Sequence, residues 1–363
     1  MPLPPLHMVD PGRFDRADVL KRLNGASRAL AELKGVAASI PNQNILINTL
    51  TLQEARDSSA IENIVTTQDD LYREDNAADA TGTAVKEVLR YRQALQAGFA
   101  QTRASGLLTR NTILDIQQQL ECNRAGLRKL PGTALRDGDG RLVYEPPQDA
   151  NEVARLMGEL ERFIHDEPAF QADPLVKMAL IHHQFESIHP FYDGNGRTGR
   201  IINVLYLVKE GLLDIPVLYL SRHMVRTKPD YYRLLQAVRE TDAWEDWVLY
   251  MLEAVANTAR ETIRTIQAIR TLLQQTKQRV RDGYRFYSQD LINNLFNHPY
   301  TRVEFVQRDL GVSRITATRY LDKLAEDGVL EKLRIGRNNY YVNRPLFGLL
   351  GRDQLADEGA RPQ

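Results

Sequence analysis

The chain has 363 residues, of which 43% are hydrophobic and 26% charged, and its 47 Lys and Arg balance its 47 Asp and Glu. This length exceeds what one small core requires, so we expect two or three packed units. Because the positive and negative charges balance, the chain has no net positive charge of the kind typical of nucleic-acid or membrane binders. Any basic surface must therefore be local.

The cysteine content and the N-terminus bear on the compartment. Cys122 is the only cysteine, which excludes an intrachain disulfide, and the Pro-rich segment 1–14 lacks the apolar core of a signal peptide. The apolar run 201–208 is far shorter than the roughly 20 residues that span a bilayer. We therefore expect a reducing, cytoplasmic setting, no membrane partner, and an ordinary helical role for Cys122.

Helical periodicity dominates the chain up to about residue 280. Apolar spacing predicts helices over 13–36, 83–99, 108–120, 151–165, 173–186, 196–210, 228–241 and 244–278. The last of these is long enough to act as a connector. The pattern breaks at 133–144, where Asp137-Gly138-Asp139-Gly140 lies between two strand-like runs and predicts a β-hairpin.

A separate pattern begins after Asp282-Gly283. Helices are expected near 286, over 302–310 and over 313–327, followed by strand-like residues in 328–342 with Gly336-Arg337 in a wing, which outlines a winged helix-turn-helix. Nine Lys and Arg face six Asp and Glu between 300 and 345, a slight excess that leaves DNA binding open beside protein docking or dimer formation. The polar tail after residue 350 is expected to be disordered.

The segment 188–200 combines a histidine, a carboxylate, a Gly-Asn-Gly turn and two arginines, and an apolar helix follows at once. Glycines on both sides of Asn195 let successive amides converge, and the helix start adds unpaired N–H groups, which together form an anion cradle. Arg197 and Arg200 lie on one helix face, where both can reach phosphate oxygens.

Two further side chains of this segment complete a site for phosphate chemistry. Asp193 lies next to the cradle, where one carboxylate can hold Mg²⁺ together with phosphate oxygens and water. His189 offers a base whose unperturbed pKa of about 6.5 suits removal of a hydroxyl proton near neutrality. His182 and His183 have no carboxylate or cysteine at zinc-ligand spacing, so we expect them to pack in the core or lie on the surface.

The string from His189 to Arg200 matches His-Pro-Phe-x-Asp-Gly-Asn-Gly-Arg-x-x-Arg without a mismatch, and the chain resembles bacterial Fic-domain protein adenylyltransferases of the SoFic type. The resemblance implies that His189 deprotonates a Tyr, Thr or Ser hydroxyl of a target protein or of the chain itself. That hydroxyl attacks the α-phosphorus of ATP and pyrophosphate leaves, with Mg²⁺ on Asp193. The resemblance also implies a set of nucleotide-binding residues: Gly194, Asn195, Gly196, Arg197, Thr198, Gly199 and Arg200.

The segment 58–63 fits the Ser/Thr-x-x-x-Glu-Gly/Asn pattern of the inhibitory helix in Fic relatives, through Ser58, Glu62 and Asn63. The resemblance implies that Glu62 forms a bidentate pair with Arg200 and occupies the room that the γ-phosphate of ATP needs. The intact enzyme would then rest mostly inactive. The alternative is that Glu62 is an ordinary solvated carboxylate.

The predicted hairpin 133–144 corresponds to the Fic flap, which in relatives binds the target protein as an added strand. Leu142, Val143 and Tyr231 are implied to touch the nucleotide base, although an aromatic residue such as Tyr231 is equally often part of a core.

The resulting prediction is a mainly α protein, with a Fic helical core, a β-hairpin flap and a C-terminal winged helix-turn-helix domain. Two rival functions stay open: removal of AMP at the same site, with Glu62 orienting water, and a DNA-binding regulator that senses nucleotide. A homodimer is also left open. The expected parts are an inhibitory helical region (1–100), the Fic core (101–250), a connector helix (251–283), the winged helix domain (284–350) and a disordered tail (351–363).

Overall fold

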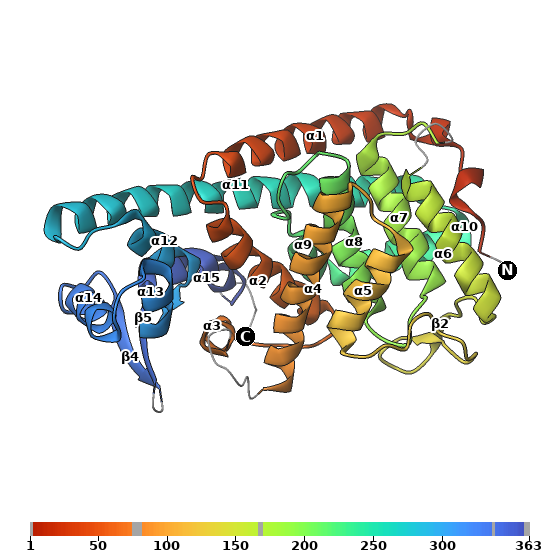
Figure 1. The fold of residues 1–363 in the computed structure, drawn as a ribbon. Coiled ribbons are helices and arrows are strands. Elements are labelled where there is room, and N and C mark those ends of the chain that lie inside the picture. The colour runs from red at the N-terminus through yellow and green to blue at the C-terminus, as the bar shows by residue number, and fades with distance from the viewer. Residues whose placement is uncertain (1–2, 75–81, 166–169, 336–337, 359–363) are drawn as a thin grey trace. The chain divides into compact units, whose positions relative to one another are not determined.

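A computed structural model describes residues 3–74, 82–165, 170–335 and 338–358. The first part of the chain is helical (Figure 1), with η1 (Leu6–Met8), η2 (Pro11–Phe14), α1 (Ala17–Ala38), α2 (Asn44–Ile61), α3 (Gln68–Glu74), α4 (Thr83–Ser105) and α5 (Arg110–Glu121). A hairpin of β1 (Leu135–Arg136) and β2 (Leu142–Tyr144) follows. The next helices are α6 (Ala150–His165), α7 (Pro174–Ile188), α8 (Asn195–Lys209), α9 (Leu220–Arg226), α10 (Lys228–Thr241) and α11 (Trp244–Gly283).

The chain forms two compact units that are interleaved in sequence. The first unit comprises residues 1–34, 54–65 and 87–260, and the second comprises 35–53, 66–86 and 261–363. The first unit contains the whole 188–200 motif and the segment 58–63. Among the residues described, no helix is both long enough and apolar enough to cross a membrane.

Helices α7 and α8 pack side by side at the centre of the first unit (Figure 1). Helix α7 begins at Pro174, after Asp173 accepts the N–H of Leu175 at 2.8 Å as an N-cap. Every residue from Leu175 to Ile188 is buried, so α7 is held on all its faces. It ends at His189 in the left-handed conformation, with φ 48°. The buried helix α7 therefore fixes the position of the candidate base, His189.

The predicted hairpin is confirmed, although its strands are shorter than the range 133–144. Strands β1 and β2 are antiparallel, with Leu135 opposite Tyr144. Asp137 Oδ1 accepts the N–H groups of Asp139 and Arg141 and closes the turn. The hairpin is tied to the rest of the unit through Tyr144.

The second unit contains helices and strands in the order that a winged helix-turn-helix requires. Helices α12 (Gln289–Asn297), α13 (Val303–Leu310) and α14 (Arg314–Glu326) accompany a sheet of β3 (Tyr300–Thr301), β5 (Asn338–Val342) and β4 (Glu331–Ile335), in that order. Helix α14 starts as expected, with Ser313 Oγ accepting the N–H of Thr316. Gly336 and Arg337, which we expected in the wing, lie outside the described residues.

The expectation of a disordered tail from residue 351 is wrong for the part that the structure describes. Helix α15 runs from Arg344 to Glu358, and residues 359–363 lie outside the described residues. Leu346 and Leu350 are buried, and Gln53 Nε2 donates to the Leu350 carbonyl at 2.6 Å. The burial of Leu346 and Leu350 and the hydrogen bond from Gln53 hold the first turns of this helix. The polar composition after residue 350 does not predict it.

Candidate active site

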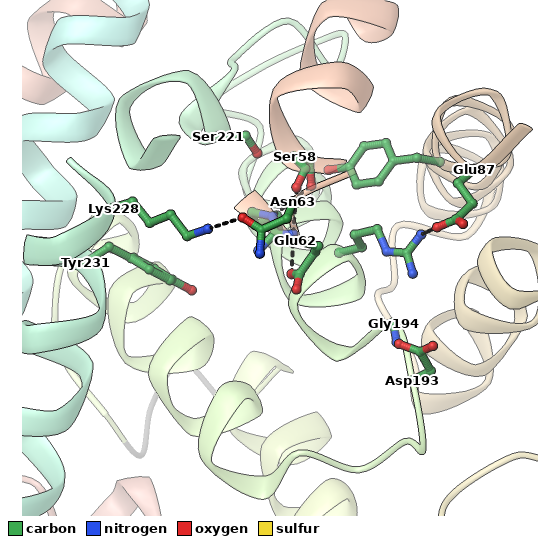
Figure 2. Close-up of polar contacts among 12 residues, drawn as sticks. Ser58, Glu62, Asn63, Glu87, Asp193, Gly194, Ser221, Lys228 and Tyr231 are labelled. Carbon is green, nitrogen blue, oxygen red and sulfur yellow. Dashed lines mark hydrogen bonds and ion pairs between the residues drawn. The ribbon is translucent and has the colours of Figure 1, made fainter. Parts of the chain in front are cut away.

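The segment 58–63 spans the end of α2 and the turn after it. Helix α2 ends at Ile61, so Glu62 and Asn63 lie just beyond the helix, and Asn63 adopts φ 62°. Lys228 Nζ donates to Asn63 Oδ1 at 3.0 Å (Figure 2), which holds the turn against α10. The predicted inhibitory helix is thus confirmed as a helix only up to the residue before Glu62.

The side chain of Arg200 contacts the segment 58–63, and Arg200 is 1% exposed. Its Nε donates to Ser58 Oγ at 2.7 Å, and its Nη2 donates to the Ser58 carbonyl at 3.0 Å and to Glu62 Oε1 at 2.9 Å. The pairing of Glu62 with Arg200 is confirmed, but its bidentate form is wrong, because Ser58 occupies the Nε donor. Burial opposes the charge on Glu62, yet Arg200 holds the pKa of this carboxyl below its usual value.

Gly196, in the first turn of α8, lies directly beside Glu62. A Cβ atom on Gly196 would lie 2.4 Å from Glu62 Oε1 and 2.9 Å from Arg200 Nη1, so a side chain there would displace this ion pair. The Glu62 carboxylate therefore already lies at the helix start, where unpaired N–H groups and the helix dipole favour an anion. This is the position that the sequence assigned to phosphate.

The side chain of Asn195 is bonded to the main chain of the motif loop. Its Oδ1 accepts the N–H of Phe191 at 2.8 Å, and its Nδ2 donates to the Phe191 carbonyl at 2.9 Å. Both ends of the amide therefore brace the motif loop, while the Phe191 ring is buried. Gly194, at φ 76°, is the N-cap of α8, so the cradle consists of main chain held by Asn195.

Arg197 lies in the same turn and is 4% exposed. Its Nη1 donates to Glu87 Oε2 of α4 at 3.0 Å (Figure 2), and its Nη2 donates to Glu121 Oε1 of α5 at 2.9 Å. Burial raises the pKa of Glu121, against the charge of Arg197. Neither carboxylate is predictable from the sequence, since each is one acidic residue on an amphipathic helix with no spacing that links it to the motif.

His189 is half-buried, and its buried Nδ1 has no hydrogen-bond partner among the described residues. Burial, together with the charges of Arg128 and Arg239, lowers the pKa of His189 to about 4. The imidazole is therefore neutral near pH 7 and able to accept a proton. Glu62 also faces it, and its charge acts in the opposite direction.

Asp193 is exposed next to the cradle. Its Oδ1 accepts the N–H of Gly194 at 2.7 Å, and its Oδ2 has no hydrogen-bond partner among the described residues. Those residues contain no cluster of three or more His, Cys, Asp or Glu side chains that could hold a metal. One free carboxylate oxygen beside an anion site is nevertheless the donor set that Mg²⁺ uses together with phosphate.

Three further residues, Leu142, Val143 and Tyr231, were predicted to contact the nucleotide base. Leu142 and Val143 lie on β2 and are 55% and 41% exposed. Tyr231 is 2% exposed, and its hydroxyl and His182 Nε2 are 2.9 Å apart, which agrees with the core alternative for this ring. Contact of these three residues with a base stays a prediction. Thr198 is also buried.

The other motif glycine and the two histidines of α7 serve packing. A Cβ atom on Gly199 would lie 2.5 Å from Glu186 Oε1, so this glycine allows α7 and α8 to approach closely. His182 and His183 are fully buried. Burial lowers the pKa of both to about 3, and their expected packing role is confirmed.

Glu54 anchors α2 one helix turn before Ser58. It accepts hydrogen bonds from the Tyr91 hydroxyl at 3.1 Å and from the hydroxyl and N–H of Ser221 in α9, a helix that the sequence analysis did not predict. Burial raises the pKa of Glu54 to about 8, with hydrogen bonds from Ser221 acting against it. The folded protein therefore keeps this carboxyl protonated at neutral pH.

This protonation predicts a pH-dependent stability. Between the ordinary pKa of 4.5 and about 8, the folded state binds a proton that the unfolded state releases, so the contribution of Glu54 to stability falls as pH rises. Glu54→Gln should remove that slope. Urea unfolding of both proteins at several pH values across this window measures the difference, and parallel curves for the two would contradict the prediction.

Sequence models of known families match three segments of the chain. The Fic/DOC family N-terminal model matches residues 20–100, the Fic/DOC family model matches 107–207, and the model of the protein adenylyltransferase SoFic-like C-terminal domain matches 272–346. The three matches follow one another and cover most of the chain.

Relatives and solved structures agree with these matches. The chain is 27% identical over 139 residues to protein adenylyltransferase Fic of Aedes aegypti, covering 38% of this chain and 27% of that protein. It is 33% identical over 96 residues to protein adenylyltransferase Fic of Drosophila melanogaster, covering 26% of this chain and 18% of that one. The chain thus matches between 18% and 27% of the length of these two curated relatives.

Solved structures extend the fold comparison over most of the chain. A Fic family protein from Desulfovibrio desulfuricans superposes with a TM-score of 0.57 at 20% identity, covering 94% of this chain and 98% of that one. Fic-1 from C. elegans superposes with a TM-score of 0.53 at 18% identity, covering 69% and 74%. With the complete motif and the three consecutive family matches, the chain belongs to the Fic/DOC family.

Proposed function

We propose that this chain transfers AMP from ATP to a hydroxyl group of a protein, and that Glu62 restrains this activity in the resting state. The observation that carries the proposal is the grouping of a neutral, half-buried His189, the glycine-lined start of α8 and the buried Arg200 in one site. A neutral base beside an anion cradle suits attack of a hydroxyl on a phosphate ester. Relatives named protein adenylyltransferase support the choice of AMP as the transferred group.

His189 supplies the base. Its neutral imidazole accepts the proton of the attacking hydroxyl while the new O–P bond forms at the α-phosphorus and the bond to pyrophosphate breaks. The strongly lowered pKa of His189 makes the imidazole a weak base in the resting protein. The contribution of His189 to the rate therefore depends on its holding the hydroxyl in line with the phosphorus. The fixed end of α7 gives His189 the position that this requires.

The start of α8 and its two arginines hold the phosphates. The N–H groups of the first turn and the forked guanidinium of Arg200 offer donors that are fixed before ATP binds, and fixed donors stabilise developing charge most effectively. Arg197 is held in the same turn by Glu87 and Glu121, which sets the direction of its fork. Asp193 would hold Mg²⁺ through its free Oδ2, and the ion would neutralise phosphate charge when bound.

Glu62 opposes the productive binding of ATP. Its carboxylate lies at Gly196 and bonds Arg200, so a phosphate group entering the same position meets a negative charge and loses its Arg200 donor. The protein target would bind along the flap, where Leu142 and Val143 are exposed. Tyr144 and Gln236 anchor the same strand, the latter donating to the Val143 carbonyl at 3.1 Å.

The lowered pKa of His189 predicts a broad pH range for activity. Because the folded imidazole stays neutral down to about pH 4, the single-turnover rate should stay flat from about pH 8 to pH 6, where a histidine with an ordinary pKa near 6.5 would lose much of its activity. Stability, in contrast, should fall as pH drops from about 6.5 towards 4, since only the unfolded state then binds the proton. A rate that halves near pH 6.5 would contradict this environment for His189.

ATP labelled at different phosphorus atoms tests the reaction itself. With Mg²⁺, label at the α-phosphate should become protein-bound, and label at the γ-phosphate should appear only in pyrophosphate. Protein-bound γ-label would show phosphoryl transfer and overturn the proposal. Release of AMP from protein already modified, without incorporation from ATP, would favour the reverse reaction.

A further inference from the structure

Arg128 lies in the connection between α5 and β1, and its side chain is 1% exposed. No carboxylate pairs with its guanidinium among the described residues. Instead its Nε donates to the His189 carbonyl at 2.8 Å, and its Nη2 donates to the carbonyls of Ile188, at 3.3 Å, and Pro147. Its own N–H donates to the Pro190 carbonyl at 2.9 Å. One residue therefore contacts three consecutive carbonyls around the candidate base.

These carbonyls explain how a buried cation exists there without a carboxylate. Helix α7 ends at Ile188, and the last carbonyls of a helix carry partial negative charge and lack partners within the helix. A guanidinium satisfies several of them at once because its donors form a fixed fork. Burial lowers the pKa of Arg128 below its ordinary value.

The backbone of His189 needs such support. At φ 48° it occupies the left-handed region, which residues other than glycine adopt only when the surroundings hold them. The following loop is fastened as well, since the Tyr192 hydroxyl accepts the N–H groups of Lys129 at 2.9 Å and Leu130 at 3.2 Å. The segment 128–130 thus binds the motif on both sides of Phe191.

We propose that Arg128 is a positioning residue for His189, which it fixes in the left-handed conformation through the Ile188, His189 and Pro190 carbonyls. This inference rests on the proposed function, in which His189 is the base. The guanidinium also places a positive charge beside the imidazole. The other groups that face His189 are Arg239, which donates to Ser187 Oγ at 3.1 Å, and the carboxylate of Glu62.

Two variants separate the geometric and electrostatic parts of this role, both made in a Glu62→Gly background. Arg128→Met removes the charge and the hydrogen bonds, whereas Arg128→Lys keeps the charge but cannot span the carbonyls. The matched control is Lys177→Met, because Lys177 is a cation that is 2% exposed near the other end of α7. It removes a buried charge from the same helix without touching the motif.

The measurements are the single-turnover rate of AMP transfer, ATP affinity, and the pKa of His189 by NMR of labelled histidine. Both Arg128 variants should lose about 10- to 100-fold in rate, as expected for a misplaced reacting group, while ATP affinity changes less than about twofold. The His189 pKa should rise in Arg128→Met and stay low in Arg128→Lys. Lys177→Met should keep the rate and the His189 pKa.

Three results would overturn the inference. They are a rate for both Arg128 variants equal to that of Lys177→Met, a parallel loss of rate and ATP affinity, and an unchanged His189 pKa in Arg128→Met. If Arg128→Met does not fold, Arg128→Lys still tests the geometric part through the rate at constant His189 pKa. Absence of AMP transfer in the Glu62→Gly parent would instead count against the proposed function, and the NMR measurement would still test the placement of Arg128.

Discussion

Glu62→Gly should raise the rate of adenylylation about 10- to 100-fold above that of the parent chain. The variant removes a charge-assisted hydrogen bond to the buried Arg200, of a kind that contributes about 1.5–3 kcal/mol, and each 1.4 kcal/mol corresponds to a factor of ten. It also clears the carboxylate from Gly196, so the first turn of α8 can accept phosphate. Incorporation of label from ATP, measured as an initial rate, gives the comparison.

The neighbouring Val65→Ala provides the control for this variant. Val65 lies two residues after Asn63 and is 77% exposed, so its truncation alters the chain beyond α2 without reaching Arg200. Its rate should equal that of the parent. Equal rates for Glu62→Gly and the parent would show that the bond to Arg200 does not limit the reaction, and Glu62 would then be an ordinary carboxylate.

His189→Ala, made in the Glu62→Gly protein, should lower the rate by about 10²- to 10⁴-fold, which is the usual contribution of a general base. ATP affinity should change little, because the cradle consists of main-chain groups and arginines rather than the imidazole. Parallel measurement of ATP binding by calorimetry and of the transfer rate separates these effects. A rate within tenfold of the Glu62→Gly protein would remove His189 from the role of base.

The motif itself was predictable because its chemistry lies in one uninterrupted stretch. His189, Asp193 and Arg200 follow one another within a helix end, a turn and a helix start, and local pattern is enough to place them. The partner of Arg200 was predictable for another reason, since Glu62 lies in a second recognisable pattern. The bidentate geometry was not, because the contact from Ser58 depends on how α2 packs.

Other parts of the site are formed by residues that are distant in sequence and come together only in the folded protein, so no local sequence pattern predicts them. Glu87 and Glu121 come from two different helices and meet Arg197 only in the fold. Arg128 lies 61 positions from His189 in sequence and acts through carbonyls, which every residue has. From the sequence, the Asn195 amide could equally face a ligand or the loop. Its hydrogen bonds with Phe191 in the structure show that it faces the loop.

The fold was predictable where periodicity is strong and less so where single anchors decide. The long α11 and the winged helix elements follow from spacing and caps. The interleaving of the two units does not, because it depends on where each helix packs rather than on its own sequence. Helix α15 depends on Leu346 and Leu350, two residues at the edge of a stretch whose composition favours disorder.

Peptide mapping by mass spectrometry tests the central claim most directly. The Glu62→Gly protein is incubated with Mg²⁺ and a mixture of nucleoside triphosphates, alone and with candidate target proteins, beside the Glu62→Gly, His189→Ala double variant. The account predicts peptides that carry AMP on a Tyr, Thr or Ser hydroxyl in the first protein and none in the second. Unmodified peptides in both proteins, or equal modification in both, would contradict it.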